Sequence, residues 1–581
     1  MKQKVGENRP LIRHSGAATP SPLGEGLFRP GFGGTLFPEE EGLGGGRPHG
    51  AAPTEDGNEE RERVSPEKVW AEYEKGVSFK QQLNLYDTVK VNEDFYVGRQ
   101  WEGVRSNGLP TPVFNYIRRI ILYLVASTAT DNLKMNASPL SCAPQEETER
   151  LCKVVNAQFE VLFERNKMGM LVRQFMRNAA VDGDACLYAW FDPDQETGQA
   201  ARGAIRTELL ENTRVIFGNP NSRQVQEQPW LIISRRERPE DVRREVRQHG
   251  GDPEQVRADT DEAGDRFDAL AEGKVTTLLK LWRNAGTGSI WAVKTVQGAV
   301  VRPAWNTEQS LYPIVWLSWD RVPNCYHGQA AVTGLIPNQI FVNKMFAMTM
   351  ISLMTTAYPK IIYDKTRVAK WDSGVGKAIG VDLGGGSISD VAKTVDPAVI
   401  SPQVSQFIEL AISLTKEFMG ATDAALGNVR PDNTSAILAL QKASQVPMEL
   451  TKQDLYQCIE DLGRIWLDLM RVYYGQRFVK VTLSERERRA RMALLPGAEA
   501  PETVVEPFDF GVLDQAALTL QLDVGGSAYW SEIAQMNTLD NLLTQGRISI
   551  VDYLERVPNG YISNQQELID ALKERETQQG N

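Results

Sequence analysis

The stretch IPNQIFVNKMFAMTMISLMTTAY (Ile336–Tyr358) decides much of the fold. It contains a single charged residue, Lys344, and it is followed by Pro359, which disfavours helix in the residue before it. With entry near Pro337, the stretch predicts one long helix ending at Tyr358. Its four methionines are typical of adaptable packing against other helices. The uncharged part, Met345–Tyr358, is too short to cross a bilayer, which needs about 20 apolar residues.

Two further long helices are predicted downstream of this stretch. The first covers about residues 401–419, where one apolar stripe recurs at helical spacing, formed by Val404, Phe407, Ile408, Ala411, Leu414 and Phe418. A polar loop, GNVRPDNTS, separates it from a longer helix over residues 435–474. Pro447 lies inside that helix with no loop residues around it, so we expect a kink there, and not a helix end.

The chain before these helices changes from helical to strand periodicity. Ser65-Pro66 is a helix-start signal, and the helical pattern continues to Val97. Three more helices are predicted over residues 115–128, 146–166 and 170–183, followed by several short strands. In the turn DPDQETG, the glycine spacing does not fit a calcium loop, so we predict a hairpin turn. The charged run over residues 235–268 is interpreted as a solvated insertion.

The composition of the 581 residues is that of an ordinary soluble protein, with 41% hydrophobic and 24% charged residues. A net charge of −11 argues against tight, general nucleic-acid binding, because neutralising phosphates requires clustered lysine and arginine. The five cysteines are scattered without a C-x-x-C pair, and there are four histidines. We therefore expect no metal site, no cofactor and no disulfide scaffold. The N-terminal residues lack the apolar segment of a signal peptide.

Residues 1–64 differ in composition from the rest, and Gly and Pro dominate them. The pattern predicts a disordered Gly/Pro-rich arm. Two interpretations of its apolar residues remain open: a plain flexible tail, or docking of these side chains on a neighbouring molecule. The residues concerned are Leu27, Phe28, Phe32, Leu36 and Phe37.

The order of these elements resembles that of tailed-bacteriophage portal proteins, the head-to-tail connectors of the capsid. NEDFYVGRQW followed by LPTPVFNYIRRIILYLV is similar to the family's opening, and RNAAVDGDACLYAWFDPD to its helix-to-strand passage. Two long helices flanking a small segment, then DNTSAILALQKAS, resemble the stem, clip and long helix. VGGSAYWSEIAQMNTLDNLLTQGRISIVDYLERV resembles the return strand and crown. The resemblance covers roughly residues 68–575.

The resemblance implies an α+β portal fold with a helical and β-rich wing, a two-helix stem, a small αβ clip, a long kinked helix and a C-terminal helical crown. The implied division, after the arm, is wing 65–326, stem helix 327–358, clip 359–397, stem helix 398–420, tunnel loop 421–434, long kinked helix 435–475, wing return strands 476–527 and crown 528–581.

The function implied by the resemblance is mechanical and not enzymatic. Subunits would form a ring, a dodecamer in this family, at one vertex of the virion capsid after assembly in the host cytoplasm. Double-stranded DNA would be packaged and ejected through it. The implied partners are the terminase large subunit, a head-tail adaptor, and the major capsid and scaffolding proteins, with no membrane. Another structural component of the head-tail connector is the alternative.

The predicted tunnel loop reaches into the channel with Asn428, Val429, Arg430, Pro431, Asp432 and Asn433. Arg430 is the candidate phosphate contact in this loop. An intersubunit salt bridge of Arg430 is an equal alternative, since exposed ion pairs contribute little energy and the sequence does not choose between the two.

The stretch KAIGVDLGGGSISDVAK (Lys377–Lys393) raises a second alternative, an actin-like ATPase, because glycines after an apolar run can bind phosphate. Such an ATPase needs a second phosphate loop and an adenosine site, and the sequence provides neither pattern. We therefore predict that Gly384, Gly385 and Gly386 form a tight turn between two short strands. No catalytic residue is predicted.

The C-terminal residues predict a series of short helices. The final helix is expected to begin at Ser563-x-x-Gln566, a capping-box spacing. Its apolar residues, Leu568, Ile569 and Leu572, form a stripe too narrow for a separate core. We therefore expect these helices to pack against neighbouring subunits.

Overall fold

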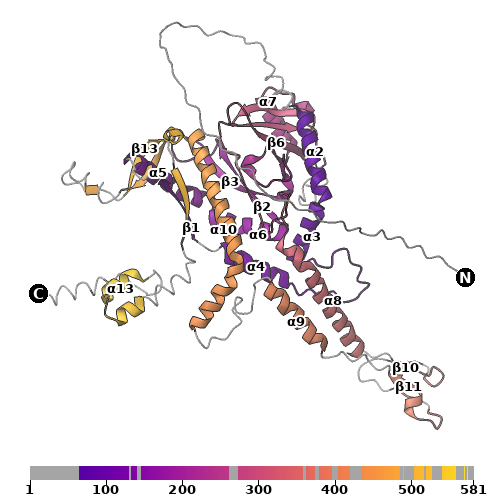
Figure 1. Ribbon diagram of the computed structural model, residues 1–581. Helices are drawn as coiled ribbons and strands as arrows, with labels where there is room; N and C mark the ends of the chain where they lie inside the picture. Colours follow the sequence, from indigo (N-terminus) through magenta and orange to yellow (C-terminus); the bar gives the residue numbers. More distant parts are fainter. Residues whose placement is uncertain are drawn as a thin grey trace, which may run out of the picture. The chain divides into compact units, whose positions relative to one another are not determined.

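The structure is a computed structural model, and Figure 1 gives its ribbon. It describes residues 65–129, 132–140, 146–199, 201–260, 273–357, 361–368, 370–372, 379–381, 383–394, 403–418, 434–483, 488–489, 503–515, 518–525, 539–557, 568–569 and 572. The predicted arm and the predicted tunnel loop residues Asn428–Asn433 lie outside these described residues.

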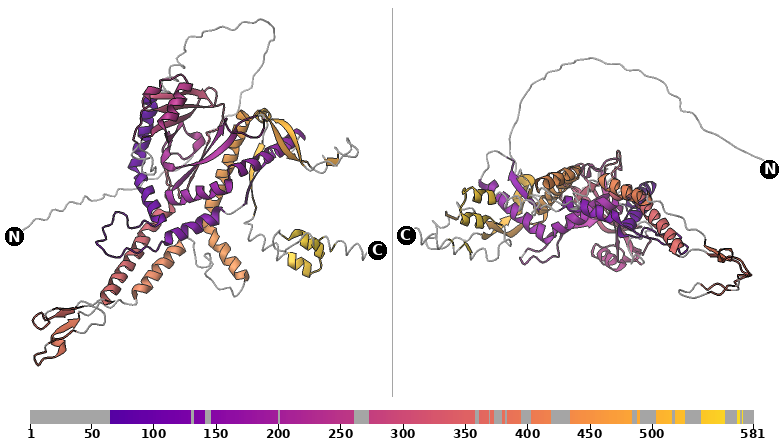
Figure 2. Two further views of the ribbon diagram at one scale, coloured as in Figure 1. Left: turned by 180° about the vertical axis from the view of Figure 1, so that it is seen from behind. Right: turned by 90° about the horizontal axis from the view of Figure 1, so that it is seen from below.

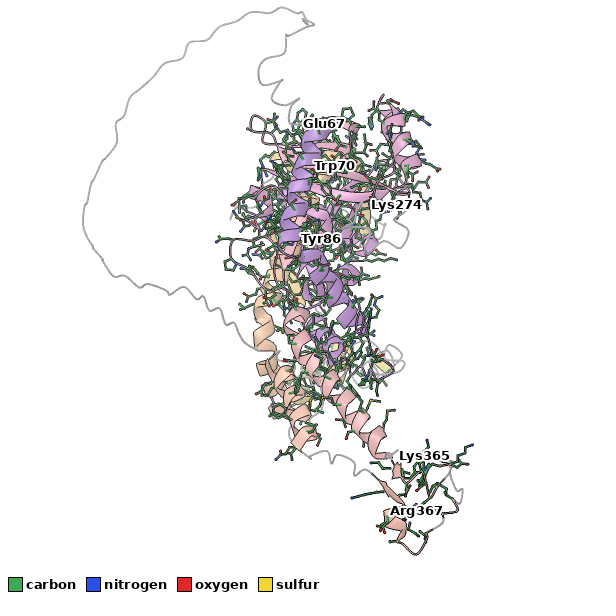
Figure 3. The ribbon with its side chains drawn as sticks, turned by 90° about the vertical axis from the view of Figure 1, so that its right-hand side faces the viewer. Glu67, Trp70, Tyr86, Lys274, Lys365 and Arg367 are labelled. Carbon is green, nitrogen blue, oxygen red and sulfur yellow. The ribbon has the colours of Figure 1, made fainter. Side chains whose placement is uncertain are left out.

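The helical pattern predicted over residues 65–97 forms two helices, α2 (Pro66–Gln82) and α3 (Leu85–Val97). Ser65 caps α2 as predicted, because its hydroxyl accepts from the Lys68 amide. The prediction of one helix was wrong at Asn84, whose φ of 51° is left-handed and interrupts the helical hydrogen bonds. Figure 3 shows α2 and the start of α3, with Glu67, Trp70 and Tyr86 labelled.

Three helices and one strand follow: α4 (Tyr116–Ala129), β1 (Asn132–Pro139), α5 (Glu146–Arg165) and α6 (Met168–Asp182). The strand β1 pairs antiparallel with β14 (Leu518–Gly525), which comes from the far end of the sequence. The apolar faces of α5 and α6 pack in the largest core cluster. Apolar periodicity predicted all three helices, but β1 was not predicted.

Two antiparallel sheets form the β-rich part. One has three strands in the order β3-β2-β9, and the other has five in the order β4-β5-β6-β7-β8. Their bounds are β2 (Asp184–Asp192), β3 (Ala204–Leu210), β4 (Val215–Phe217), β5 (Trp230–Glu237), β6 (Val275–Arg283), β7 (Ile290–Val296), β8 (Ala299–Asn306) and β9 (Ile314–Ser318). The strand β8 was not predicted. Short 3-10 turns η1 (Asn212–Arg214), η2 (Val225–Glu227) and η3 (Pro253–Gln255) connect neighbouring elements.

The charged run over residues 235–268 was predicted to be a solvated insertion, but its described part, residues 235–260, is only partly exposed. It begins within β5 and contains the helix α7 (Pro239–Gln248). Val242 and Val246 of α7 are buried with Val256 and Val301 in a small apolar cluster. Valines at i and i+4 place both side chains on one face of the helix, so charged neighbours do not prevent packing.

The long helices are α8 (Ala331–Ala357), α9 (Gln403–Phe418) and α10 (Thr434–Tyr473). The predicted entry of α8 near Pro337 was wrong, because the helix begins six residues earlier, at Ala331, and contains Pro337 within it. The helix α10 continues through Pro447, and its ribbon changes direction along its length in Figures 1 and 2.

The C-terminal half of α10 lies in the largest core cluster. Leu455, Leu462 and Trp466 are fully buried there, and Trp466 packs edge-on against Phe163 of α5. After α10 come β12 (Gln476–Thr482) and β13 (Thr503–Asp509), which pair antiparallel, and then η6 (Phe510–Gln515). The residues after α10 thus pack in the same core cluster as helices from the N-terminal part of the chain. The described elements together are a mixed α+β fold.

The described C-terminal residues include α13 (Ile550–Arg556), which begins with a capping box of Ser549 and Asp552. The predicted box at Ser563 and Gln566 lies outside the described residues. Val551 and Leu554 of α13 form a small cluster with Ile569, and Leu572 packs against it. The predicted narrow stripe therefore has a partner within the chain.

Candidate subunit interface and channel elements

The first half of α8 is joined to the rest of the chain by two buried amide side chains, Gln339 and Asn343. Gln339 Nε2 donates to the Phe114 carbonyl at 2.8 Å and to Asn343 Oδ1 at 3.0 Å. Asn343 Nδ2 donates to Gln100 Oε1 at 2.6 Å. A buried amide without partners is costly, so this satisfied network determines how α8 leaves the domain.

An aromatic contact also joins α8 to the residues just before α4. Phe114, just before α4, stacks on Phe346 of α8 with ring centroids 3.9 Å apart. Nearer the start of α8, the buried Asn92 of α3 donates to Thr333 Oγ1 at 3.0 Å and to the Val181 carbonyl at 2.9 Å. The start of α8 is thus held by α3, α4 and α6.

The helices α8 and α9 pack against each other. Asn338 Nδ2 of α8 donates to Thr415 Oγ1 of α9 at 3.1 Å, and Phe341 lies edge-on to Phe407 at 6.1 Å. Thr415 and Ile408 are buried. One side of α9 therefore packs against α8 of the same chain, and this packing accounts for part of the predicted apolar stripe of α9.

Six large apolar side chains of these two helices are nevertheless exposed, including Phe407 despite its contact with Phe341. On α8 and on α9 they recur at helical spacing, and each has between 40% and 59% of its surface exposed. We call them the exposed stripes: Met350, Leu353 and Met354 on α8, and Phe407, Leu410 and Leu414 on α9. Apolar side chains grouped in this way on a soluble protein mark contact surfaces for other molecules.

The segment between α8 and α9 contains a small two-stranded sheet of β10 (Ile361–Tyr363) and β11 (Ala392–Thr394), which pair antiparallel. Directly after β10, the carboxylate of Asp364 accepts from the Thr366 hydroxyl and from the Thr366 amide. These hydrogen bonds, the hydroxyl's above all, lower the pKa of Asp364. Figure 3 labels Lys365 and Arg367, which lie in this turn.

The three glycines lie in a turn between β10 and β11. The Gly386 amide donates to the Leu383 carbonyl at 2.7 Å. Gly384 and Gly385 have φ values of 50° and 87°, which side chains rarely adopt. No atom lies within 4 Å of a side chain placed at either of these two positions, so the described chain leaves them open.

Of the strands predicted around this turn, residues 376–383 and 387–393, only the end of the second is confirmed, and part of the first lies outside the described residues. Ile379–Val381 and Leu383 form no strand among the described residues before it, and Ile388–Asp390 is the 3-10 helix η5. The physical reason is local: the Ser387 and Asp390 side chains form a capping box, which favours helical turns over extended chain. The strand residues are Ala392–Thr394, and they pair with β10.

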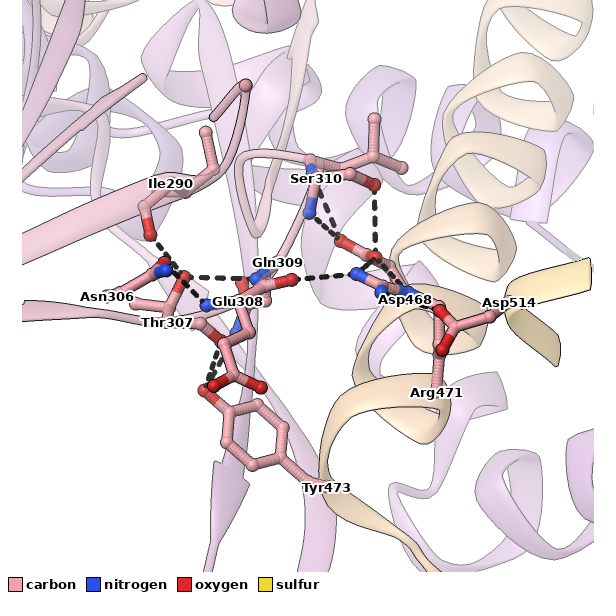
Figure 4. A network of polar contacts seen from close by, with 12 residues as sticks. Ile290, Asn306, Thr307, Glu308, Gln309, Ser310, Asp468, Arg471, Tyr473 and Asp514 are labelled. Carbon is pink, nitrogen blue, oxygen red and sulfur yellow. Dashed lines mark hydrogen bonds and ion pairs between the residues drawn. The ribbon is translucent and has the colours of Figure 1, made fainter. Parts of the chain in front are cut away.

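The C-terminal part of α10 is joined to the loop between β8 and β9, and Figure 4 shows the contacts. Asp468 accepts from the Ser310 amide at 2.7 Å and from the Leu311 amide at 3.0 Å. Arg471 bonds Asp468 at 2.8 Å and the Glu308 carbonyl at 2.7 Å. These contacts join this end of α10 to the β-rich part of the chain.

Just before α8, the buried His327 and Asp184 form a pair, with His327 Nδ1 at 2.8 Å from Asp184 Oδ2. Asp184 Oδ1 also accepts from the Ser318 hydroxyl at 2.7 Å and the Gly328 amide at 2.8 Å. Burial lowers the pKa of His327, although Asp184 raises it in part. The pair fixes the chain where it enters α8. No pattern in the sequence around His327 predicts its pairing with Asp184.

Nothing in the described ranges suggests a metal centre: they contain no group of three or more His, Cys, Asp or Glu placed to hold an ion. None of the helices in the described part of the chain is long and apolar enough to span a membrane.

A mixed α+β chain with exposed apolar stripes on two long helices has the features of a subunit that packs against other protein molecules. Comparison with known families agrees: residues 72–506 match the family of phage P22-like portal proteins. The match covers well over half of the 581 residues, and the chain belongs to this family. Members of the family are structural proteins of the phage capsid vertex. No match was found among curated proteins.

Proposed function

We propose that the chain assembles into a closed ring, a dodecamer, at one capsid vertex, and that double-stranded DNA is packaged and ejected through the ring. In this proposal the terminase large subunit and head-tail adaptors dock on the ring, and the major capsid and scaffolding proteins surround it. Assembly takes place in the host cytoplasm. A ring is required because a single chain does not enclose DNA, and each subunit then meets the next through a different face.

The observation that supports this proposal best is the pair of exposed stripes. Leu353 of α8 is 58% exposed and Phe407 of α9 is 59% exposed, although both are large apolar side chains. Exposed apolar surface costs about 25 cal/mol for each Å² that could be buried. A second copy that covers these stripes removes that cost, and in a ring each subunit covers its neighbour.

The proposed division of the chain is the one that the resemblance to portal proteins implies. The helices α8 and α9 are the proposed stem, and residues 359–397 between them the proposed clip. The loop 421–434 is the proposed tunnel loop, and Arg430 within it contacts either a DNA phosphate or a neighbouring subunit. Residues 65–326 and 476–527 are the proposed wing, with the crown at 528–581.

The first experiment is negative-stain electron microscopy of the purified full chain, with mass measured in solution. We expect rings with a central hole. A chain that stays monomeric over a wide range of concentration and salt would contradict the proposal.

A pair of variants then tests the exposed stripes. Leu353→Gln, combined with Phe407→Gln, should abolish rings, because both substitutions put polar groups into the proposed interface. The subunit itself should remain folded by circular dichroism, since both side chains are exposed in it. Leu353→Met is the matched control, and it should still form rings because it keeps an apolar side chain of similar volume. Rings formed equally by all variants would exclude the stripes as the interface.

A further inference from the structure

A polar pocket lies between two loops of the β-rich part, at residues 221–224 and 321–325. Its volume is about 380 Å³. The first loop leads into η2, and the second connects β9 to α8. The loops are held together where the Tyr326 amide donates to the Pro220 carbonyl at 3.1 Å.

The charges of the pocket are of one sign. Arg223 and Arg321 both line it, and no Asp or Glu is among its lining residues. Arg223 is half-buried, and in the described part of the chain it has no ion-pair partner. Arg321 is more exposed and pairs with Asp454 of α10. Arg223 also lines a neighbouring cavity together with Asp461, whose carboxylate pairs with Arg464.

The remaining polar groups add uncharged donors. Asn221, Ser222 and Asn324 line the pocket with short side chains that can donate hydrogen bonds. Asn324 has a φ of 54°, a left-handed conformation that asparagine tolerates better than most residues. Ser318, which also lines the pocket, donates its hydroxyl hydrogen bond to the buried Asp184. The pocket thus brings neutral donors together with the two guanidinium groups.

We infer that this pocket binds a phosphate group through Arg223 and Arg321. Guanidinium donors match the geometry of phosphate oxygens, and neutral donors complete the shell. The volume exceeds that of phosphate alone, so a phosphate ester also fits. Two sources supply such a group: a small molecule, either free phosphate or a nucleotide, and the backbone of DNA. The binding chemistry is the same for both sources.

The test measures binding to the purified full chain by titration calorimetry, with three probes: inorganic phosphate, a nucleoside monophosphate and a short DNA duplex. Arg223→Gln should weaken binding of inorganic phosphate roughly tenfold or more, because it removes charge-assisted hydrogen bonds. Asp454→Asn should strengthen it, because Arg321 is then released from its carboxylate partner. Arg244→Gln, which removes an exposed arginine of α7, is the charge-matched control and should change affinity less than about twofold.

The probes distinguish the two sources. Binding of phosphate and nucleotide without duplex binding identifies a small-molecule site, whereas duplex binding that Arg223→Gln weakens identifies the DNA backbone. The inference is overturned if the wild-type chain binds none of the probes, or if Arg223→Gln binds them as the wild type does.

Discussion

Lys80 provides the sharpest test of how the N-terminal helices are held. Its side chain is fully buried on α2, and its ammonium group donates to the carbonyls of Asn212 and Thr213 at 2.9 Å and of Val215 at 2.7 Å. An ammonium has three N–H donors, so these bonds use all of them. They connect α2 to η1 and to the start of β4.

The proposed change is Lys80→Met, which keeps the length of the side chain and removes its donors. Each buried carbonyl left without a donor costs roughly 1–3 kcal/mol. The cost at Val215 is smaller, because its carbonyl also accepts from the Tyr326 hydroxyl at 3.4 Å. Removing a buried charge returns part of the loss. We therefore expect the free energy of unfolding to fall by roughly 2–4 kcal/mol.

Hydrogen exchange is the suitable measurement, because a long chain with several core clusters does not unfold in one step. The expected loss corresponds to about 30- to 1,000-fold faster exchange of the protected amides in α2 and β4. Lys75→Met is the matched control on the same helix, and since Lys75 is exposed it should change stability by less than about 0.5 kcal/mol. Equal exchange in the two variants would refute the reasoning that Lys80 connects these elements.

Three further predictions concern the proposed clip, the long helix and pH. The double variant Gly384→Ala with Gly385→Ala should impair ring assembly or DNA packaging, because each left-handed residue then costs roughly 1–2 kcal/mol. The control Gly380→Ala should not impair either. Normal packaging by the double variant contradicts this prediction. Pro447→Ala should keep or raise the melting temperature, because proline costs about 3 kcal/mol inside a helix, but lower the amount of packaged DNA; unchanged packaging excludes a functional kink. His327 has a lowered pKa when folded, so its contribution to stability is present above its unfolded pKa of about 6.5 and is lost as pH falls. His327→Asn should therefore reduce the drop in melting temperature from pH 7 to pH 5, and an unchanged drop would assign it to other groups.

The elements that the sequence predicted share a strong local signal. The helices from α4 to α6 have apolar residues at helical spacing, and β2 and β3 are β-rich runs around a polar turn. The elements that it missed depend on distant partners. The strand β1 is stabilised by pairing with β14, almost 400 residues away, and no local pattern reports such a pairing.

The buried polar groups were also beyond the sequence, for a related reason. Gln339, Asn343 and Lys80 are residue types that are usually exposed, and each is buried because particular carbonyls or amides meet it. Those partners lie on other elements, so the arrangement of the chain must be known first. The basic pocket between the loops with Arg223 and Arg321 has the same origin, since about 100 residues separate its two sides.

The helix α9 shows where periodicity stops being informative even when the helix itself is predicted correctly. Its stripe predicts that Phe407, Ile408 and Leu414 are all removed from water, yet within one chain Ile408 is buried and the other two are exposed. Burial against the same chain and burial against a neighbouring copy impose the same apolar pattern, because the hydrophobic effect depends on area removed from water and not on which molecule covers it. In an assembling subunit, the residues predicted as core but found exposed therefore indicate where the next copy packs. On α9 those residues are Phe407 and Leu414, and the ring experiment with Phe407→Gln tests this directly.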